Sequence, residues 1–132
     1  MTVHRIDPER LSPAYGYSHV TVATGQHVFT AGAVPLDESG TLVGDGDAVL
    51  QTERCLHNLR IALEAAGATA EDVAKVTIFV VPRRPGTLID VWGAVMGSTD
   101  ISLLPTATTL LGISALGYPG QLVEIEATAV VD

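Results

Sequence analysis

The sequence has 132 residues and is acidic, with 15 Asp and Glu residues against 7 Lys and Arg residues and a formal net charge of −8. This balance argues against a nucleic-acid-binding surface, because such surfaces use Lys and Arg to neutralise phosphates. A hydrophobic content of 47% and a charged content of 17% are typical of a globular protein with its own core. We therefore expect a single domain over residues 1–132.

No apolar run of the sequence is long enough for a membrane-spanning helix, and residues 1–10 lack the apolar core of a secretory signal. The one cysteine, Cys55, has no partner for an internal disulfide and no apparent basic partner to activate it, which is typical of a packing thiol in a reducing compartment. The four histidines show no ligand spacing. We expect a cytoplasmic protein that contacts no membrane and holds no metal.

The N-terminal part of the sequence predicts two strands and a long loop. Residues 18–24 and 27–32 alternate in the manner of strands and are joined by a tight turn that begins at Gly25. The loop over residues 35–48 is rich in Gly and Asp.

A helix is predicted over residues 48–66, with Asp47 as the N-cap and Gly67 as the left-handed residue that ends it. Its apolar stripe consists of Leu56, Leu59, Leu63 and Ala66. The β-branched residues of 75–81 then predict a buried strand.

A second helix is predicted from Thr87, because Thr87 and Asp90 resemble a capping box. Its apolar stripe consists of Leu88, Val91, Trp92 and Val95. Residues 108–116 and 122–131 predict two further strands around a turn at 117–120, and hence a closing hairpin.

The resulting order, β-β-α-β-α-β-β, predicts an α+β sandwich in which a mixed β-sheet carries two helices on one face. Alternation along 122–131 separates the side chains of this strand into two faces. The face without helices would carry Leu122, Glu124, Glu126, Thr128 and Val130. Such a face is too apolar to be left to water, so we expect self-association.

Two segments, residues 51–80 and 122–130, resemble the Rid/YjgF family of reactive intermediate deaminases, which is often labelled endoribonuclease L-PSP. "HVFTAGAVP" (27–35) is similar to the strand of that family that ends in a Ser-Gly-Gln-Ile-Pro-like motif. The resemblance implies a chorismate-mutase-like (YjgF/RidA-like) fold and a homotrimer with a small-molecule ligand in each inter-subunit cleft. It also implies hydrolysis of imines or enamines without a metal or organic cofactor.

The resemblance also implies roles for individual residues. Glu126 occupies the position of the family's catalytic glutamate, and Tyr17 that of a tyrosine in the substrate cleft. The motif serine corresponds to Ala31, which lies between Thr30 and Gly32.

The family arginine that grips a substrate carboxylate falls within residues 103–112, at either Ala107 or Thr108. Neither alignment supplies an arginine, and the next small polar position is Thr109 or Leu110. A guanidinium holds a carboxylate through two charge-assisted hydrogen bonds, which Ala or Thr cannot replace. We therefore expect an altered, less charged ligand, bound by residues that include Ala107, Thr108 and Thr109.

Three further residues are possible members of the site. Glu124 lies one strand period from Glu126, His19 could act as an acid or base, and Tyr118 could form an aromatic wall. Two of them have an ordinary structural role as the alternative: an interface hydrogen bond for Glu124, and a solvated or hydrogen-bonded ring for His19.

Three functions remain open on this sequence. The first is a Rid-type enzyme, in which Glu126 activates water or shuttles a proton on an imine, an enamine or a related carbonyl-derived intermediate. The second is a non-catalytic ligand-binding or regulatory trimer on the same scaffold. Three replacements favour it: Ala31 for the motif serine, Ala33 for the motif glutamine, and "PTATT" (105–109) without the arginine. The third is an endoribonuclease-type role, which the acidic composition does not favour.

Overall fold

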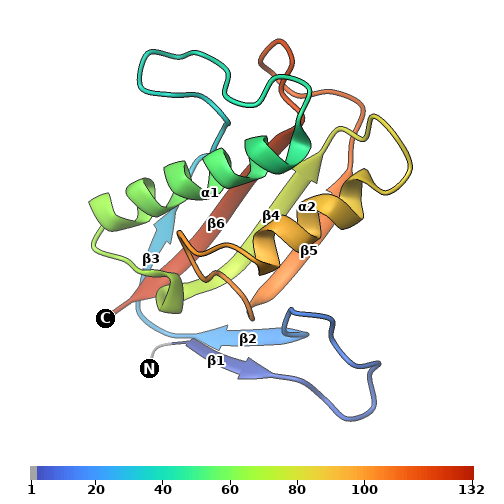
Figure 1. Cartoon of the computed structure of the whole chain (residues 1–132). Coiled ribbons are helices and arrows are strands. Elements are labelled where there is room, and N and C mark those ends of the chain that lie inside the picture. Colours follow the sequence, from blue (N-terminus) through green and yellow to red (C-terminus); the bar gives the residue numbers. More distant parts are fainter. Residues whose placement is uncertain (1–2) are drawn as a thin grey trace.

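The computed structural model describes residues 3–132, which form two helices, two sheets and one short 3-10 turn (Figure 1). The elements in chain order are β1 (Val3–Ile6), β2 (Val20–Ala23), β3 (Gln26–Phe29), α1 (Ala48–Ala65), η1 (Ala70–Asp72), β4 (Val73–Val80), α2 (Thr87–Met96), β5 (Ala107–Gly112) and β6 (Val123–Val131). Within the described residues, neither helix combines the length and the apolarity needed to cross a membrane.

The main sheet has four strands in the order β3-β6-β4-β5. Strands β4 and β5 are parallel, whereas β6 is antiparallel to both β3 and β4, so the sheet is mixed. Both helices pack on the same face of this sheet (Figure 1). This arrangement confirms the predicted α+β architecture with two helices on one face.

A second, two-stranded sheet of β1 and β2 lies at the end of the main sheet where β4 and β5 begin (Figure 1). It is attached by side-chain hydrogen bonds, since Thr21 Oγ1 donates to the carbonyl of Ala74 and Arg5 Nε donates to that of Pro105. The sequence did not predict β1, which has only four residues.

Both predicted hairpins are wrong, although most of their strands exist. Strand β2 pairs with β1 and strand β3 pairs with β6, so the segments on either side of Gly25 separate into different sheets. Strand β5 pairs with β4, while β6 inserts between β3 and β4. Turn residues indicate that the chain reverses, but the partner of each strand is decided by packing across the whole sheet.

Helix α1 follows its sequence signals closely. Asp47 Oδ1 accepts a hydrogen bond of 3.0 Å from the backbone N–H of Leu50, and Gly67 adopts a φ of +75° after the last turn. Helix α2 begins differently from the prediction, because Gly86 in a left-handed conformation precedes it and no side chain caps it. Thr87 Oγ1 instead donates to the carbonyl of Arg84.

The hydrophobic core lies between the two helices and the sheet. Its largest fully buried apolar side chains are Leu56, Leu59, Leu63, Ile78, Leu103, Leu122 and Ile125. Leu122 precedes β6 and belongs to this core, and Val130 is only 1% exposed. Both were predicted on the helix-free face. Leu122 lies in the core instead, whereas Val130 keeps the predicted side, in register with His27, but is buried within the single chain.

Candidate functional site

The helix-free side of the main sheet, here called the open face, carries most of the polar candidates. Strand register assigns residues to it, because paired residues on neighbouring strands point to the same side. Its members are His27, Phe29, Lys75, Thr77, Phe79, Ala107, Thr109, Leu111, Glu124, Glu126 and Thr128. Phe29 is 75% exposed, so this face is unprotected in the single chain.

Glu126 lies in the middle strand of a polar row that crosses three strands. It pairs with Thr77 of β4, which in turn pairs with Thr109 of β5. Glu126 is exposed, and the ion pairs found within residues 3–132 all lie elsewhere. Its carboxylate is therefore available to a ligand or a water molecule on the open face.

Glu124 is held more firmly than Glu126. The buried side chain of Gln121 donates from Nε2 to Glu124 Oε1 over 3.1 Å. The Glu124 carboxylate lies directly over Gly32, where an added Cβ would come within 2.1 Å of Oε2. Sequence reasoning overlooked Gln121, because a single glutamine after a turn has no pattern that marks it.

The segment from Thr30 to Ala33 brings the motif residues beside β6. Thr30 is hydrogen-bonded to Ala127, and Ala33 to Ile125. An advance of three residues along this segment therefore pairs with an advance of two residues along β6. The additional residue is a β-bulge, a feature that re-aims side chains at sheet edges. Ala31 and Gly32 lie within it, and Gly32 thereby comes against Glu124.

Tyr17 and Thr108 meet on the opposite side of the sheet from Glu126. Ser18 forms a parallel bridge with Ala107, so Tyr17 points to the side that carries α2. A pocket of ≈ 250 Å³ is lined there by Tyr15, Tyr17, Trp92, Thr108 and Leu110. Within one chain the structure therefore does not bring Tyr17 and Thr108 together with Glu126.

His19 and Tyr118 have clear structural surroundings. His19 Nε2 lies 2.7 Å from the carbonyl of Ser12, and its ring packs edge-on against that of Tyr17. Tyr118 is half exposed, and its backbone N–H donates to Gln121 Oε1 over 3.2 Å. Tyr118 thus contributes to the orientation of Gln121, which in turn holds Glu124.

Lys75 is a cation of the open face that sequence reasoning did not single out. It pairs with Ala107 on one side and Thr128 on the other. Its Nζ donates a hydrogen bond of 2.8 Å to Thr109 Oγ1. Strand register, which brings Lys75 beside Ala107, cannot be obtained from the spacing of either segment alone.

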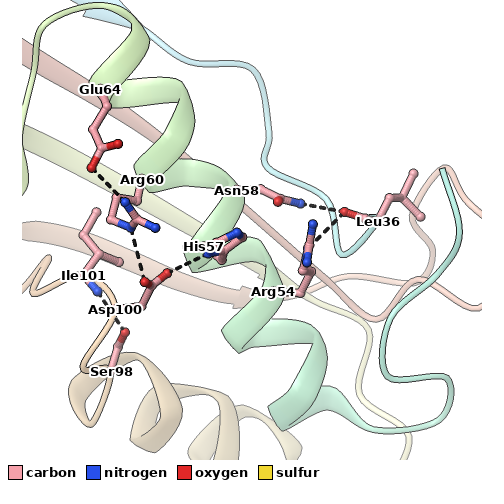
Figure 2. Close-up of polar contacts among 9 residues, drawn as sticks. All are labelled: Leu36, Arg54, His57, Asn58, Arg60, Glu64, Ser98, Asp100 and Ile101. Carbon is pink, nitrogen blue, oxygen red and sulfur yellow. Dashed lines mark hydrogen bonds and ion pairs between the residues drawn. The ribbon is translucent and has the colours of Figure 1, made fainter. Parts of the chain in front are cut away.

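A separate polar network covers the outer side of α1 (Figure 2). Asp100 lies 3.2 Å from both His57 Nδ1 and Arg60 Nε, and Arg60 also pairs with Glu64. Asn58 donates to the carbonyl of Leu36. These contacts attach two loops to α1, and nothing about them requires a ligand. Within residues 3–132, no group of three or more His, Cys, Asp and Glu residues is arranged to hold a metal ion.

Cys55 is fully buried in the core, on the side of the sheet that carries the helices. Its Sγ lies 3.5 Å from the carbonyl of Val123. Burial raises the pKa of the Cys55 thiol well above its ordinary value, with a smaller contribution from the negative charge of Glu124. A thiol that stays protonated is a poor nucleophile, so this residue acts in packing.

Comparison with known proteins places this fold and site in context. The family model described as Endoribonuclease L-PSP matches residues 8–131. Protein DfrA of Myxococcus xanthus is 33% identical over 125 residues, which cover 93% of this chain and 88% of that protein. A RutC family protein of Pyrococcus abyssi is 42% identical over 60 residues, 45% of this chain and 46% of that protein.

Solved structures agree with these sequence matches. The Rid family protein YyfB of Yersinia pestis, itself of unknown function, has a TM-score of 0.85 and 33% identity over 99% of this chain and 100% of its own. The YjgF protein of E. coli has a TM-score of 0.68 and 26% identity, with 96% and 98% of the two chains covered. The fold is therefore the α+β sandwich of the YjgF and Rid proteins. The chain belongs to the endoribonuclease L-PSP family, which includes them.

Proposed function

We propose that this protein is a Rid-type enzyme that hydrolyses a small imine, or the imine form of an enamine, without an organic cofactor. The substrate differs from that of family members with the full motif, because no arginine occupies residues 103–112. The reaction adds water across the C=N bond, and the resulting carbinolamine then loses ammonia to leave a carbonyl.

Three proton transfers define what a side chain must supply for a protonated imine. A carboxylate removes a proton from the attacking water, and the resulting acid protonates the nitrogen of the carbinolamine. The carboxylate then accepts the hydroxyl proton as the C–N bond breaks, the carbonyl forms and ammonia leaves. Glu126 is the proposed acid and base, and Glu124 is the alternative because Gln121 and Gly32 fix its position. Thr77 and Thr109 offer hydroxyls to orient the ligand in the same row.

The observation that carries this proposal is the polar row of Glu126, Thr77 and Thr109 on the open face. A carboxylate without an ion pair, beside hydroxyl donors and an exposed aromatic face, is suited to proton transfer on a small ligand. Because Glu126 is exposed, its carboxylate is solvated in the single chain, and a ligand can take the place of that water.

The proposed assembly is a homotrimer with ligand clefts between subunits. Two features favour association: the exposed Phe29 side chain on the open face, and the position of β5 at the edge of the sheet, where only its start is covered, by the bridge from Ser18 to Ala107. A neighbouring copy at that edge would also enclose the Tyr17 pocket. Light scattering that finds only monomer at micromolar concentrations would remove the inter-subunit cleft from this proposal.

Ammonia release from short-lived imines tests the activity. An amino-acid oxidase generates the imines in the cuvette, and a coupled assay follows the ammonia. We expect the wild type to accelerate release, Glu126→Gln to abolish the acceleration and Glu53→Gln, on the outer side of α1, to retain it. If Glu124→Gln rather than Glu126→Gln is inactive, the acid and base role passes to Glu124.

A non-catalytic ligand-binding trimer is the second candidate, favoured by Ala31 and Ala33 in place of the family's polar residues. It would be indicated by wild-type protein that binds small carbonyl compounds and leaves imine hydrolysis unchanged. An endoribonuclease role is the third candidate, and the net charge of −8 weighs against it.

A further inference from the structure

Lys75 is the only lysine among the 132 residues, and it lies on the open face of an acidic chain. It pairs in register with Ala107, one of the two positions at which the family arginine would fall. The positive charge of Lys75 therefore lies on β4, one strand away from the position on β5 at which the family arginine is absent.

The ammonium of Lys75 is anchored but not neutralised. One of its three N–H groups donates to Thr109 Oγ1, and the ion pairs found within the described residues involve other cations. Thr109 accepts this bond, so its own hydroxyl proton remains free to donate. Lys75 and Thr109 can thus offer a ligand oxyanion up to three donors from one place.

The distance to the carboxylates fits a small bound molecule. Glu126 is the diagonal neighbour of Lys75, since it lies two residues along β6 from Thr128, the direct partner of Lys75. Diagonal neighbours on a sheet face are roughly 7–8 Å apart. The hydrogen bond to Thr109 directs Lys75 Nζ towards β5, which is the side of β4 away from Glu126. Thr77 lies on the sheet surface between the Lys75 ammonium and the Glu126 carboxylate.

We propose that Lys75 and Thr109 form the anion-binding subsite of the open face, and that this subsite takes the carboxylate of a small ligand. The inference rests on the proposed function only for the role of Glu126 as the reacting group. In this arrangement the ligand carboxylate lies over β4 and β5, and the adjacent electrophilic carbon lies towards Glu126. The substrate thus keeps a negative charge, which is bound at a different place from that expected of an arginine on β5.

The single lysine makes the test specific. Protein grown with ¹³C-labelled lysine gives one Cε signal, and binding can be followed there by NMR and in parallel by calorimetry. The probes are pyruvate, which has a carboxylate beside a carbonyl, and pyruvamide, its neutral isostere. We expect pyruvate to shift the Lys75 signal to saturation and pyruvamide to leave it in place.

Variants separate charge from folding. We expect Lys75→Met to weaken pyruvate binding by about 10-fold to 100-fold, the effect of losing charge-assisted hydrogen bonds. Lys75→Arg keeps the positive charge and should stay within about five-fold of the wild type. Arg83→Met removes an exposed cation from the loop before α2 and should leave binding unchanged.

Three outcomes overturn the proposal: pyruvate that does not bind, pyruvamide that binds as tightly as pyruvate, or Lys75→Met that binds like the wild type. Binding and catalysis can fail separately. If pyruvate binding depends on Lys75 while ammonia release is absent, the subsite stands and the enzymatic proposal fails. If ammonia release is clear but indifferent to Lys75 and to substrate charge, the enzyme stands and the subsite fails.

Discussion

The side-chain amide of Gln121 holds the carboxylate of Glu124 over the bare backbone of Gly32, through a hydrogen bond of 3.1 Å between Nε2 and Oε1. The same Nε2 also donates to the carbonyl of Val123 over 3.0 Å, and Gln121 Oε1 accepts from Tyr118. Glu124 is thus positioned by a buried group with little freedom of its own.

The contact with Gly32 makes a first prediction. Gly32→Ala places a methyl group where the Glu124 carboxylate lies, so the carboxylate must move and lose its bond to Gln121. We expect a loss of about 1–3 kcal/mol in the free energy of unfolding, measured by urea denaturation. Gly93→Ala is the control, because an added methyl there meets no atom within 4 Å. Equal stability of the two variants would contradict the close approach.

A second prediction concerns the two alternative positions of the absent arginine. Ala107 faces the open side with Lys75, whereas Thr108 faces the pocket of Tyr17 and Trp92. We expect Ala107→Arg to tighten the binding of pyruvate about 10-fold through a bidentate contact, and Thr108→Arg to give no gain. Calorimetry measures both affinities. A gain in Thr108→Arg alone would show that the anion is bound on the helix side.

Ala107→Arg carries a second, independent readout. The new guanidinium would lie directly opposite Lys75, and like charges in paired positions destabilise a sheet. We expect unfolding at a lower urea concentration in the absence of ligand and a recovery when pyruvate is added.

Gln51 makes a third prediction, about the loops around the sheet end. Its buried side chain donates to the carbonyls of Gly44 and Gly120 and accepts from the backbone N–H of Leu122. Gln51→Ala leaves these three groups without their partner, so the free energy of unfolding should fall by about 3 kcal/mol. Gln26→Ala, at an exposed glutamine, should change it by less than about 0.5 kcal/mol. Similar urea midpoints for the two variants would show that water replaces the lost bonds.

The buried thiol makes a fourth prediction, about alkaline pH. Because burial raises the pKa of Cys55 in the folded protein, only the unfolded chain releases this proton from about pH 8.5 upwards. The contribution of Cys55 to stability is present below that pH and decreases as the pH rises. Cys55→Ala should therefore show a shallower decline of stability between pH 8.5 and 10.5 in urea denaturation. If the free energies of unfolding of the wild type and of Cys55→Ala decline in parallel over this pH range, the prediction is wrong.

The positions of the helices were predictable because their signals are local. The apolar stripe of α1, the cap at Asp47 and the stop at Gly67 all lie within one continuous segment. The structure confirms the cap, the stop and the burial of Leu56, Leu59 and Leu63, whereas Ala66 follows the helix and is exposed. The pairing of strands was not predictable, because the competing partners lie far apart in the sequence. The last strand was found almost where it lies, at Val123–Val131 instead of 122–131, but alternation along one strand did not predict the burial of Leu122 and Val130.

The candidate site was predictable in its residues more than in its geometry. Glu126, Glu124 and Thr109 share the open face as strand alternation implies, whereas Tyr17 and Thr108 occupy the other side. Lys75 and Gln121 were missed for a common reason. The hydrogen-bond partner of Lys75 is 34 residues away along the chain, and the Glu124 carboxylate that Gln121 holds lies against Gly32, which belongs to a segment before α1.

The last strand of the chain occupies an interior place in the main sheet, between β3 and β4. Strands β3 and β4 therefore have no common partner until β6 arrives, and the pairing of β3 with β6 closes a loop that runs from Phe29 to Val123. Such long-range closure makes folding slow relative to helical proteins of this size. It also makes the open face a late product of folding, since the row from Glu126 to Thr109 exists only once β6 has paired with β4. Any partner that binds this face accordingly selects molecules that have completed their fold.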